Sequence, residues 1–267
     1  MAGGKRKKGI AHVVAVNMGY GHERPAHVLR DLSTHGKVTI ANDYDSIPES
    51  DRNLWDSSRR IYEKISRFKK VPILGKVAFG AMDKIQRIPE FYPRRDLSRP
   101  SLQVLEMYAL IRRRKWCKHL IEMLAENPIP FIATYMVPGF AAEEFGYPGD
   151  IYMVVTDADM SRAWVAKDPK RSRIKYFAPN GRVVERLKLY GVRPGNIELT
   201  GFPLPHEAIG GAKSETAIKN LGRRICNLDP NGFFMSRAQG TLKAKLGLKT
   251  CKLIAGKRPK PIHIAFA

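Results

Sequence analysis

The chain has 267 residues, of which 43% are hydrophobic and 9% aromatic, so it is long enough for one large α/β domain with a real core, and no apolar run is long enough for a transmembrane helix. Its 47 Lys and Arg against 25 Asp and Glu give a net charge of +22, which implies an anionic partner (nucleic acid, an anionic bilayer or a phosphorylated substrate) unless its host's proteins are basic in general. The three cysteines form no CxxC pair, which argues against a disulfide framework or a zinc site and indicates a reducing cytoplasm.

The chain opens with a strand–helix–strand pattern. After a basic tail over 1–9, the nearly continuous apolar run 10–16 is typical of a buried parallel strand. A helix is predicted over 24–34, with Pro25 near its first turn, and a second strand over 37–41. This order predicts a Rossmann-like, doubly wound parallel sheet of the α/β class.

A basic helical insertion is predicted over 51–126. It begins with an amphipathic helix over 51–70, continues in an apolar stretch over 71–79, and ends in a long helix over 101–126. Basic residues beside apolar ones match an interfacial element that rests on anionic lipid. The predicted membrane-contact residues are Arg59, Arg60, Arg67, Phe68, Lys69, Lys70, Ile73, Leu74 and Phe79. The alternative is a helical pair that caps the sheet and leaves its basic side in solvent.

The alternation of strands and helices then resumes. Strands are predicted over 129–134, 151–156, 175–178 and 197–200, and helices over 138–145 and 181–190. The segment 206–260 is expected to be an irregular linker with one short helix near 237–246. Residues 261–267 are interpreted as the first strand of a second domain that is cut off.

Three segments carry a family resemblance. They are Val16–Ala26 with its Gly19-Tyr20-Gly21-His22 loop, Val155-Thr156-Asp157 continuing to Trp164, and Tyr176–Asn180 followed by Gly191-Val192 and Thr200–Leu204. In this order they resemble the N-terminal, acceptor-binding domain of GT-B glycosyltransferases. The similar enzymes are monogalactosyldiacylglycerol synthases, diacylglycerol glucosyltransferases and the enzyme that adds N-acetylglucosamine to lipid I. The resemblance spans residues 10–205.

The resemblance implies a function. Such an enzyme moves a sugar from a nucleotide-sugar, here a UDP-sugar, to a lipid or lipid-linked acceptor at the inner face of the membrane. The donor binds in a second Rossmann domain, which nothing after Pro205 supplies, so the chain by itself is expected to be inactive. No cofactor and no metal are expected. Asp157-Ala158-Asp159 has the spacing of a metal-binding Asp-x-Asp motif but falls on the acceptor side.

The first loop has chemistry of its own. Gly19 and Gly21 let the backbone approach a ligand at the end of a strand, beside a helix N-terminus, and Tyr20 lies between them. His22 would face the crevice and act as a general base toward an acceptor hydroxyl. The alternative is a tight turn with a solvent-exposed histidine.

The later strand ends supply the remaining candidates. Asp157 is predicted to orient His22 or bind sugar hydroxyls, with a turn or helix-cap role as the alternative. Thr134, Arg162 and Trp164 are predicted to contact the acceptor, although a tryptophan here also fits a packing role. Ser161 stands where the lipid glucosyltransferases commonly have a histidine, which puts diacylglycerol as the acceptor in doubt, and Arg162 suits a phosphate-bearing acceptor.

Two other functions compete with this one. A nucleic-acid-binding protein would explain the charge and the run Arg112-Arg113-Arg114-Lys115, but the charge is spread over many segments and no nucleic-acid motif is found. A sugar-nucleotide epimerase of the GT-B fold would explain the same motifs without an acceptor.

Overall fold

A computed structural model describes residues 10–33, 36–68, 88–229 and 231–256. The chain divides into two units between Pro203 and Leu204, beside the domain end predicted at 205. The predicted tail 1–9, the apolar stretch 71–79 and the final strand 261–267 lie outside the described residues.

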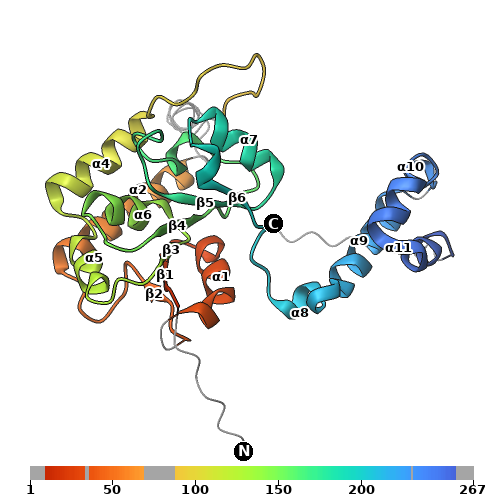
Figure 1. The fold of residues 1–267 in the computed structure, drawn as a ribbon, viewed down its shortest axis with the longest axis horizontal. Coiled ribbons are helices and arrows are strands. Elements are labelled where there is room, and N and C mark those ends of the chain that lie inside the picture. The colour runs from red at the N-terminus through yellow and green to blue at the C-terminus, as the bar shows by residue number, and fades with distance from the viewer. Residues whose placement is uncertain (1–9, 34–35, 69–87, 230, 257–267) are drawn as a thin grey trace, which may run out of the picture. The chain divides into compact units, whose positions relative to one another are not determined.

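The first unit is built on a six-stranded sheet in the order β2-β1-β3-β4-β5-β6, with every neighbouring pair parallel (Figure 1). The strands are β1 (His12–Ala15), β2 (Thr39–Ile40), β3 (Phe131–Ala133), β4 (Ile151–Val154), β5 (Lys175–Ala178) and β6 (Ile197–Leu199). This confirms the predicted Rossmann-like α/β fold. Because β2 lies on one side of β1 and all later strands on the other, the strand order reverses between β1 and β3.

Both faces of the sheet are covered, as a doubly wound fold requires. β1 is buried at every position because alternate residues face different helices. Val13 and Ala15 pack with Ala26 of α1. Val14 and Val16 belong to the main core on the opposite face.

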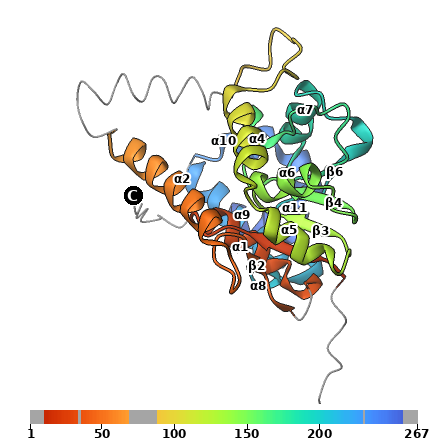
Figure 2. The ribbon, with the colours of Figure 1, turned by 90° about the vertical axis from the view of Figure 1, so that its left-hand side faces the viewer.

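In the described part of the first unit, the helices follow the strands in the alternation that the sequence predicts. They are α1 (Tyr20–Val28), α2 (Glu49–Phe68), α4 (Leu102–Arg114), α5 (Lys118–Ala125), α6 (Met136–Glu144) and α7 (Gly181–Leu189), with short 3-10 turns at Arg30–Leu32, Arg162–Trp164 and Pro194–Asn196. In Figures 1 and 2, α4, α5 and α6 lie side by side on one face of the sheet. α1 begins four residues before the predicted helix start because Gly19, with φ 115°, already turns the chain out of the strand, so Pro25 lies inside the helix rather than near its first turn.

The long helix predicted over 101–126 is wrong. α4 ends at Arg114 and α5 begins at Lys118, with Lys115 and Cys117 in the left-handed region. The corner is held from α2: the Asp51 carboxylate accepts a hydrogen bond from the Cys117 amide at 3.1 Å, and Trp55 packs edge-on against Trp116 at 4.6 Å between ring centroids. Burial of this indole pair stabilises a break that the helical spacing of the sequence does not reveal.

The second unit is mostly helical, whereas the sequence predicts an irregular linker with one short helix. It contains α8 (His206–Ile209), a 3-10 turn at Gly211–Lys213, α9 (Glu215–Leu228), α10 (Phe233–Arg237) and α11 (Gln239–Gly256). Ile218 and Ile225 of α9 pack against Leu242, Leu246 and Cys251 of α11. These apolar positions recur at helical spacing between many Lys and Gly residues, so their periodicity is easily overlooked.

The predicted membrane-contact residues are only partly described. Arg59 and Arg60 lie on α2 with exposed side chains, and Ile61 beside them is 60% exposed. Arg67 and Phe68 belong to α2, but their side chains are not described, and Lys69, Lys70, Ile73, Leu74 and Phe79 lie outside the described residues. Within the described ranges, no helix combines the length and apolar character that crossing a bilayer requires.

The contact between Asp51 and the Cys117 amide yields a stability prediction. Asp51→Ala leaves a buried amide without an acceptor and is expected to lower the free energy of unfolding by about 1–3 kcal/mol in chemical denaturation. Asp51→Asn keeps an oxygen acceptor and is expected to cost less, because burial raises the pKa of the Asp51 carboxyl and so disfavours its charge. The exposed Asp56 on the same helix is the control, with a change within about 0.5 kcal/mol on substitution by Ala. Equal losses for Asp51→Ala and Asp56→Ala would contradict the proposed anchor.

Candidate functional site

The predicted histidine lies at the carboxyl edge of the sheet, where the strand order reverses. His22 is in the first turn of α1, which follows β1. Thr134 directly follows β3, and Thr156 follows β4, the next strand in the sheet. In open parallel sheets, ligands bind at this edge, outside the point of reversal.

The His22 ring is held on one side by both neighbouring strand ends. Its Nδ1 lies 3.1 Å from the Thr134 carbonyl oxygen and 3.0 Å from the Thr156 hydroxyl. The Thr134 hydroxyl in turn donates to the His22 carbonyl at 2.7 Å. Two rings pack around the imidazole, Tyr135 at 4.8 Å and Trp164 at 6.0 Å between centroids. Thr134 therefore orients the helix start and the ring together.

These partners determine the tautomer of His22. A carbonyl oxygen only accepts, so the proton on the ring belongs on Nδ1 and is donated to Thr134. The Thr156 hydroxyl oxygen accepts from the same N–H, which makes the hydrogen bond bifurcated. In the neutral ring, Nε2 then carries the lone pair, and no hydrogen-bond partner for it occurs in the described part of the chain. The geometry leaves Nε2 ready to accept a proton.

The surroundings also keep the ring neutral. Burial lowers the pKa of His22 below its ordinary value of 6.5, and this effect outweighs the Thr134 carbonyl and the charge of Asp157, which both raise it. A base that is largely unprotonated near pH 7 suits proton abstraction from a hydroxyl.

Asp157 and Trp164 are joined by a hydrogen bond. The Trp164 indole N–H donates to the Asp157 carboxylate at 2.7 Å, and the tryptophan is only 3% exposed. Trp164 is thus a packing residue beside His22, the alternative considered from the sequence, and not an exposed stacking platform. Asp157 is exposed at the same edge.

The glycine loop leaves open space in front of the helix. Gly19 and Gly21 are exposed, and a Cβ added to either would meet nothing within 4 Å. Gly19 adopts φ 115°, which a residue with a side chain rarely tolerates, so its role is conformational. The backbone of Tyr20 begins α1, and its side chain is not described.

Two predicted acceptor-contact residues point inward. Thr134 is fully buried, and its hydroxyl is occupied by the His22 carbonyl. Arg162 is 7% exposed, and its guanidinium donates to the carbonyl groups of Ser98, Val165 and Ala166. Both residues therefore have structural roles in this arrangement, and neither presents a polar group to the crevice.

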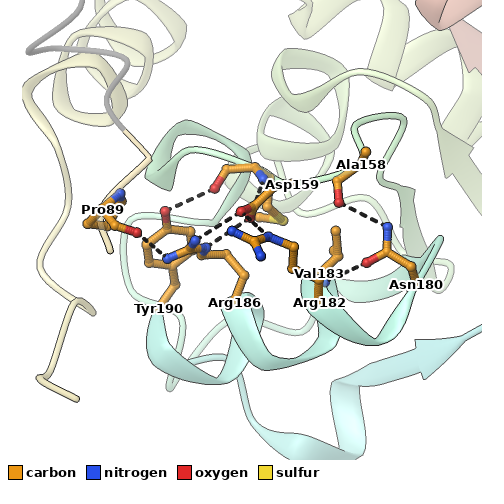
Figure 3. Close-up of polar contacts among 9 residues, drawn as sticks. Pro89, Ala158, Asp159, Asn180, Arg182, Val183, Arg186 and Tyr190 are labelled. Atoms are coloured by element: carbon orange, nitrogen blue, oxygen red, sulfur yellow. Dashed lines mark hydrogen bonds and ion pairs between the residues drawn. The ribbon is translucent and has the colours of Figure 1, made fainter. Parts of the chain in front are cut away.

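The loop that carries Asp157 is anchored through Asp159 (Figure 3). Arg186 of α7, 1% exposed, binds both oxygens of this carboxylate at 2.9 and 3.0 Å and donates to the Pro89 carbonyl at 2.6 Å. Arg182 adds a third contact at 2.7 Å from a more exposed position. The hydrogen bonds from the two arginines hold the pKa of Asp159 below its ordinary value, although burial acts in the opposite direction. Asp159 is thus engaged in ion pairs with both arginines.

Residues of the site that sequence reasoning missed are Thr156 and Tyr135. Each stands just after a buried strand, which is a usable signal, because parallel strands end at a common edge. The sequence, however, does not state that β3 and β4 are the strands that follow β1 in the sheet.

Comparisons with protein-family models, curated proteins and solved structures find no match to this chain. Among the described residues, no group of three or more His, Cys, Asp or Glu is arranged to hold a metal ion. The site is therefore characterised by its own geometry: a neutral histidine with an available Nε2, an exposed carboxylate nearby and an open glycine loop.

The lowered pKa of His22 gives a testable pH dependence. The Cε1–H resonance of His22 is expected to titrate with a midpoint below 6.5 in NMR. Since the folded state then binds fewer protons than the unfolded chain, the contribution of His22 to stability is complete above about pH 6.5 and is lost as the pH falls through the folded pKa. His22→Asn should remove that part of the pH dependence. A midpoint above 6.5 would show that the ring is not desolvated.

The two arginines on Asp159 provide a matched pair of variants. Arg186→Gln removes the buried partner and is expected to lower the free energy of unfolding by about 3–5 kcal/mol. Arg182→Gln removes the exposed partner, whose side chain is 61% accessible, and should cost less than about 1 kcal/mol. Chemical denaturation at neutral pH measures both. Similar small losses would mean that the Asp159 anchor contributes little to holding the loop.

Proposed function

We propose that this chain is the acceptor-side domain of a GT-B glycosyltransferase, which transfers a sugar from a nucleotide-sugar to a hydroxyl group of a lipid or lipid-linked acceptor. The observation that carries the proposal is the neutral His22, with Nδ1 bound to the Thr134 carbonyl and Nε2 available, at the edge where the strand order reverses. This is the arrangement that a general base needs: a fixed ring, a defined tautomer and a lowered pKa.

In the proposed reaction, Nε2 of His22 takes the proton of the acceptor hydroxyl. The acceptor oxygen forms a bond to the anomeric carbon of the donor sugar, and the bond from that carbon to the nucleotide phosphate breaks. The nucleoside diphosphate leaves with the electron pair. Asp157, exposed at the same edge, favours the imidazolium that forms and is available to bind sugar hydroxyls.

The donor is proposed to bind in a second Rossmann domain, as in the enzymes that the motifs resemble. A UDP-sugar is the proposed donor on that resemblance. The net charge of +22 supports attraction to an anionic membrane that carries the acceptor, at its inner face. Arg59 and Arg60, exposed on α2, supply part of that charge.

The role of His22 is tested in the protein that carries this domain together with its donor-binding domain. His22→Ala is expected to lower turnover by about tenfold or more, because the acceptor hydroxyl loses its base. His22→Asn keeps an amide donor for the Thr134 carbonyl but has no Nε2, so it should lose the same activity with the fold better preserved. Transfer of radiolabelled sugar from UDP-galactose, UDP-glucose and UDP-N-acetylglucosamine to extracted membrane lipid provides the measurement.

The matched control is His27→Ala. His27 is exposed on the same helix, so His27→Ala makes the same substitution in α1 as His22→Ala. It should leave turnover unchanged. Unchanged turnover in His22→Asn would remove His22 from the chemistry. Absence of lipid glycosylation with every donor, together with epimerisation or hydrolysis of the donor, would overturn the transferase proposal in favour of a sugar-nucleotide epimerase.

A further inference from the structure

A concave site lies on the first unit, formed by residues other than those around His22. It is a hollow of about 530 Å³, within the range of about 300–1,000 Å³ typical of small-molecule sites. Its lining residues are Ser98, Arg99, Pro100, Arg112, Lys167, Asp168, Pro169 and Lys170. They come from three places in the chain: the segment before α4, the last turn of α4, and the loop after Trp164.

Hydrogen bonds from one buried arginine connect two of the segments that line the hollow. Arg162 donates to the Ser98 carbonyl through Nε and Nη2, at 3.2 and 2.8 Å, and to the Ala166 carbonyl at 2.9 Å, so one guanidinium ties the two sides together. Gly191 packs closely against both segments, because a Cβ there would come within 2.7 Å of Ser98 and 3.2 Å of Pro169. The shape is therefore present before any ligand arrives, which lowers the ordering cost of binding.

The positive charge in and beside the hollow is only partly neutralised. Arg162 is 7% exposed, and its hydrogen bonds go to carbonyl oxygens; within the described ranges it forms no ion pair with a carboxylate. Arg99, Lys167 and Lys170 add three cations at the rim. Buried charges are ordinarily paired, so this surplus is a specific feature of the site.

The acidic groups nearby offset part of this surplus, and one of them is Asp96, whose carboxylate interacts with Lys170 and Arg99. Asp168 is the acidic residue of the lining, so the four cations Arg99, Lys167, Lys170 and Arg162 stand against two carboxylates, and two positive charges remain in excess. Arg112 is bound by Glu144 at 2.6 Å, but its side chain remains 52% exposed at the rim. A concave surface with cations on opposite sides focuses positive potential and attracts a compact anion.

We infer that this hollow binds a phosphate group, either of a free phosphorylated small molecule or of a phospholipid headgroup. Lysine and arginine side chains at the rim would donate to the phosphate oxygens, and the buried Arg162 would supply field without direct contact. The inference stands independently of the glycosyltransferase proposal, since no residue of the hollow is assigned to sugar transfer.

Titration of the isotope-labelled chain with pyrophosphate tests this inference. At constant ionic strength near physiological salt, the backbone amides of Arg99, Lys167 and Lys170 are expected to shift together on a saturable curve. The double variant Lys167→Gln, Lys170→Gln should weaken binding by about fivefold or more, the effect of losing two charge-assisted contacts. The control Arg113→Gln, Arg114→Gln removes the same charge from exposed positions on α4 outside the lining, and should change affinity less than about twofold.

Vesicles distinguish the source of the phosphate. Shifts of the same amides with phosphatidylcholine vesicles containing phosphatidylglycerol, but not with phosphatidylcholine alone or with pyrophosphate, identify a lipid headgroup. Shifts with pyrophosphate identify a free phosphorylated molecule.

Equal weakening in the two double variants would show that only the overall charge matters, and unsaturable shifts spread over the whole surface would show the same. Either result overturns the inference. Because the readout is binding, loss of sugar transfer in His22 variants does not affect it.

Discussion

The hydrogen bond from His22 Nδ1 to the Thr134 carbonyl is the contact on which the candidate site depends. It joins the helix that follows β1 to the end of β3, the two strands between which the sheet order reverses. The Thr134 hydroxyl returns a hydrogen bond to the His22 backbone, so ring and helix start are fixed by the same residue. The orientation and the tautomer of the imidazole follow from this junction, while Tyr135 and Trp164 pack around the ring. Proton abstraction at Nε2 is the chemistry that we propose for it.

Two buried arginines hold the loop after β4 in place, as Thr134 holds His22. Arg186 reaches from α7 to Asp159, and Arg162 folds back onto the carbonyl groups of its own loop and of Ser98. Both anchors lie within the segment that begins with Asp157 and ends with Trp164. Part of the large positive charge therefore serves inside the domain, where it organises an irregular segment. The remainder lies on the surface, where it is available to anionic partners.

Much of the fold was predictable because buried parallel strands are short apolar runs. β5 occupies the predicted residues 175–178, and the other strands lie within the predicted ranges. The place of His22 at the carboxyl edge of the sheet was predictable because its loop follows the first strand; its role in catalysis stays a prediction. The break between α4 and α5 was not predictable from the sequence, because it depends on Asp51 and Trp55, which are distant from it along the chain. The inward roles of Thr134 and Arg162 were not predictable either. The sequence does not show whether a polar side chain after a strand faces a ligand or binds the backbone.

The hydrogen bond from His22 to the main chain of Thr134 affects which substitutions the site can tolerate over evolutionary time. The group that fixes the tautomer of His22 is a main-chain oxygen, which every amino acid carries. Substitution at position 134 would alter how firmly α1 is held, through the lost hydroxyl, yet it would still offer the imidazole an acceptor. The tautomer of the histidine is thereby less sensitive to substitution at position 134. Inheritance of the site requires the histidine itself and the path of the backbone, more than any particular set of surrounding side chains.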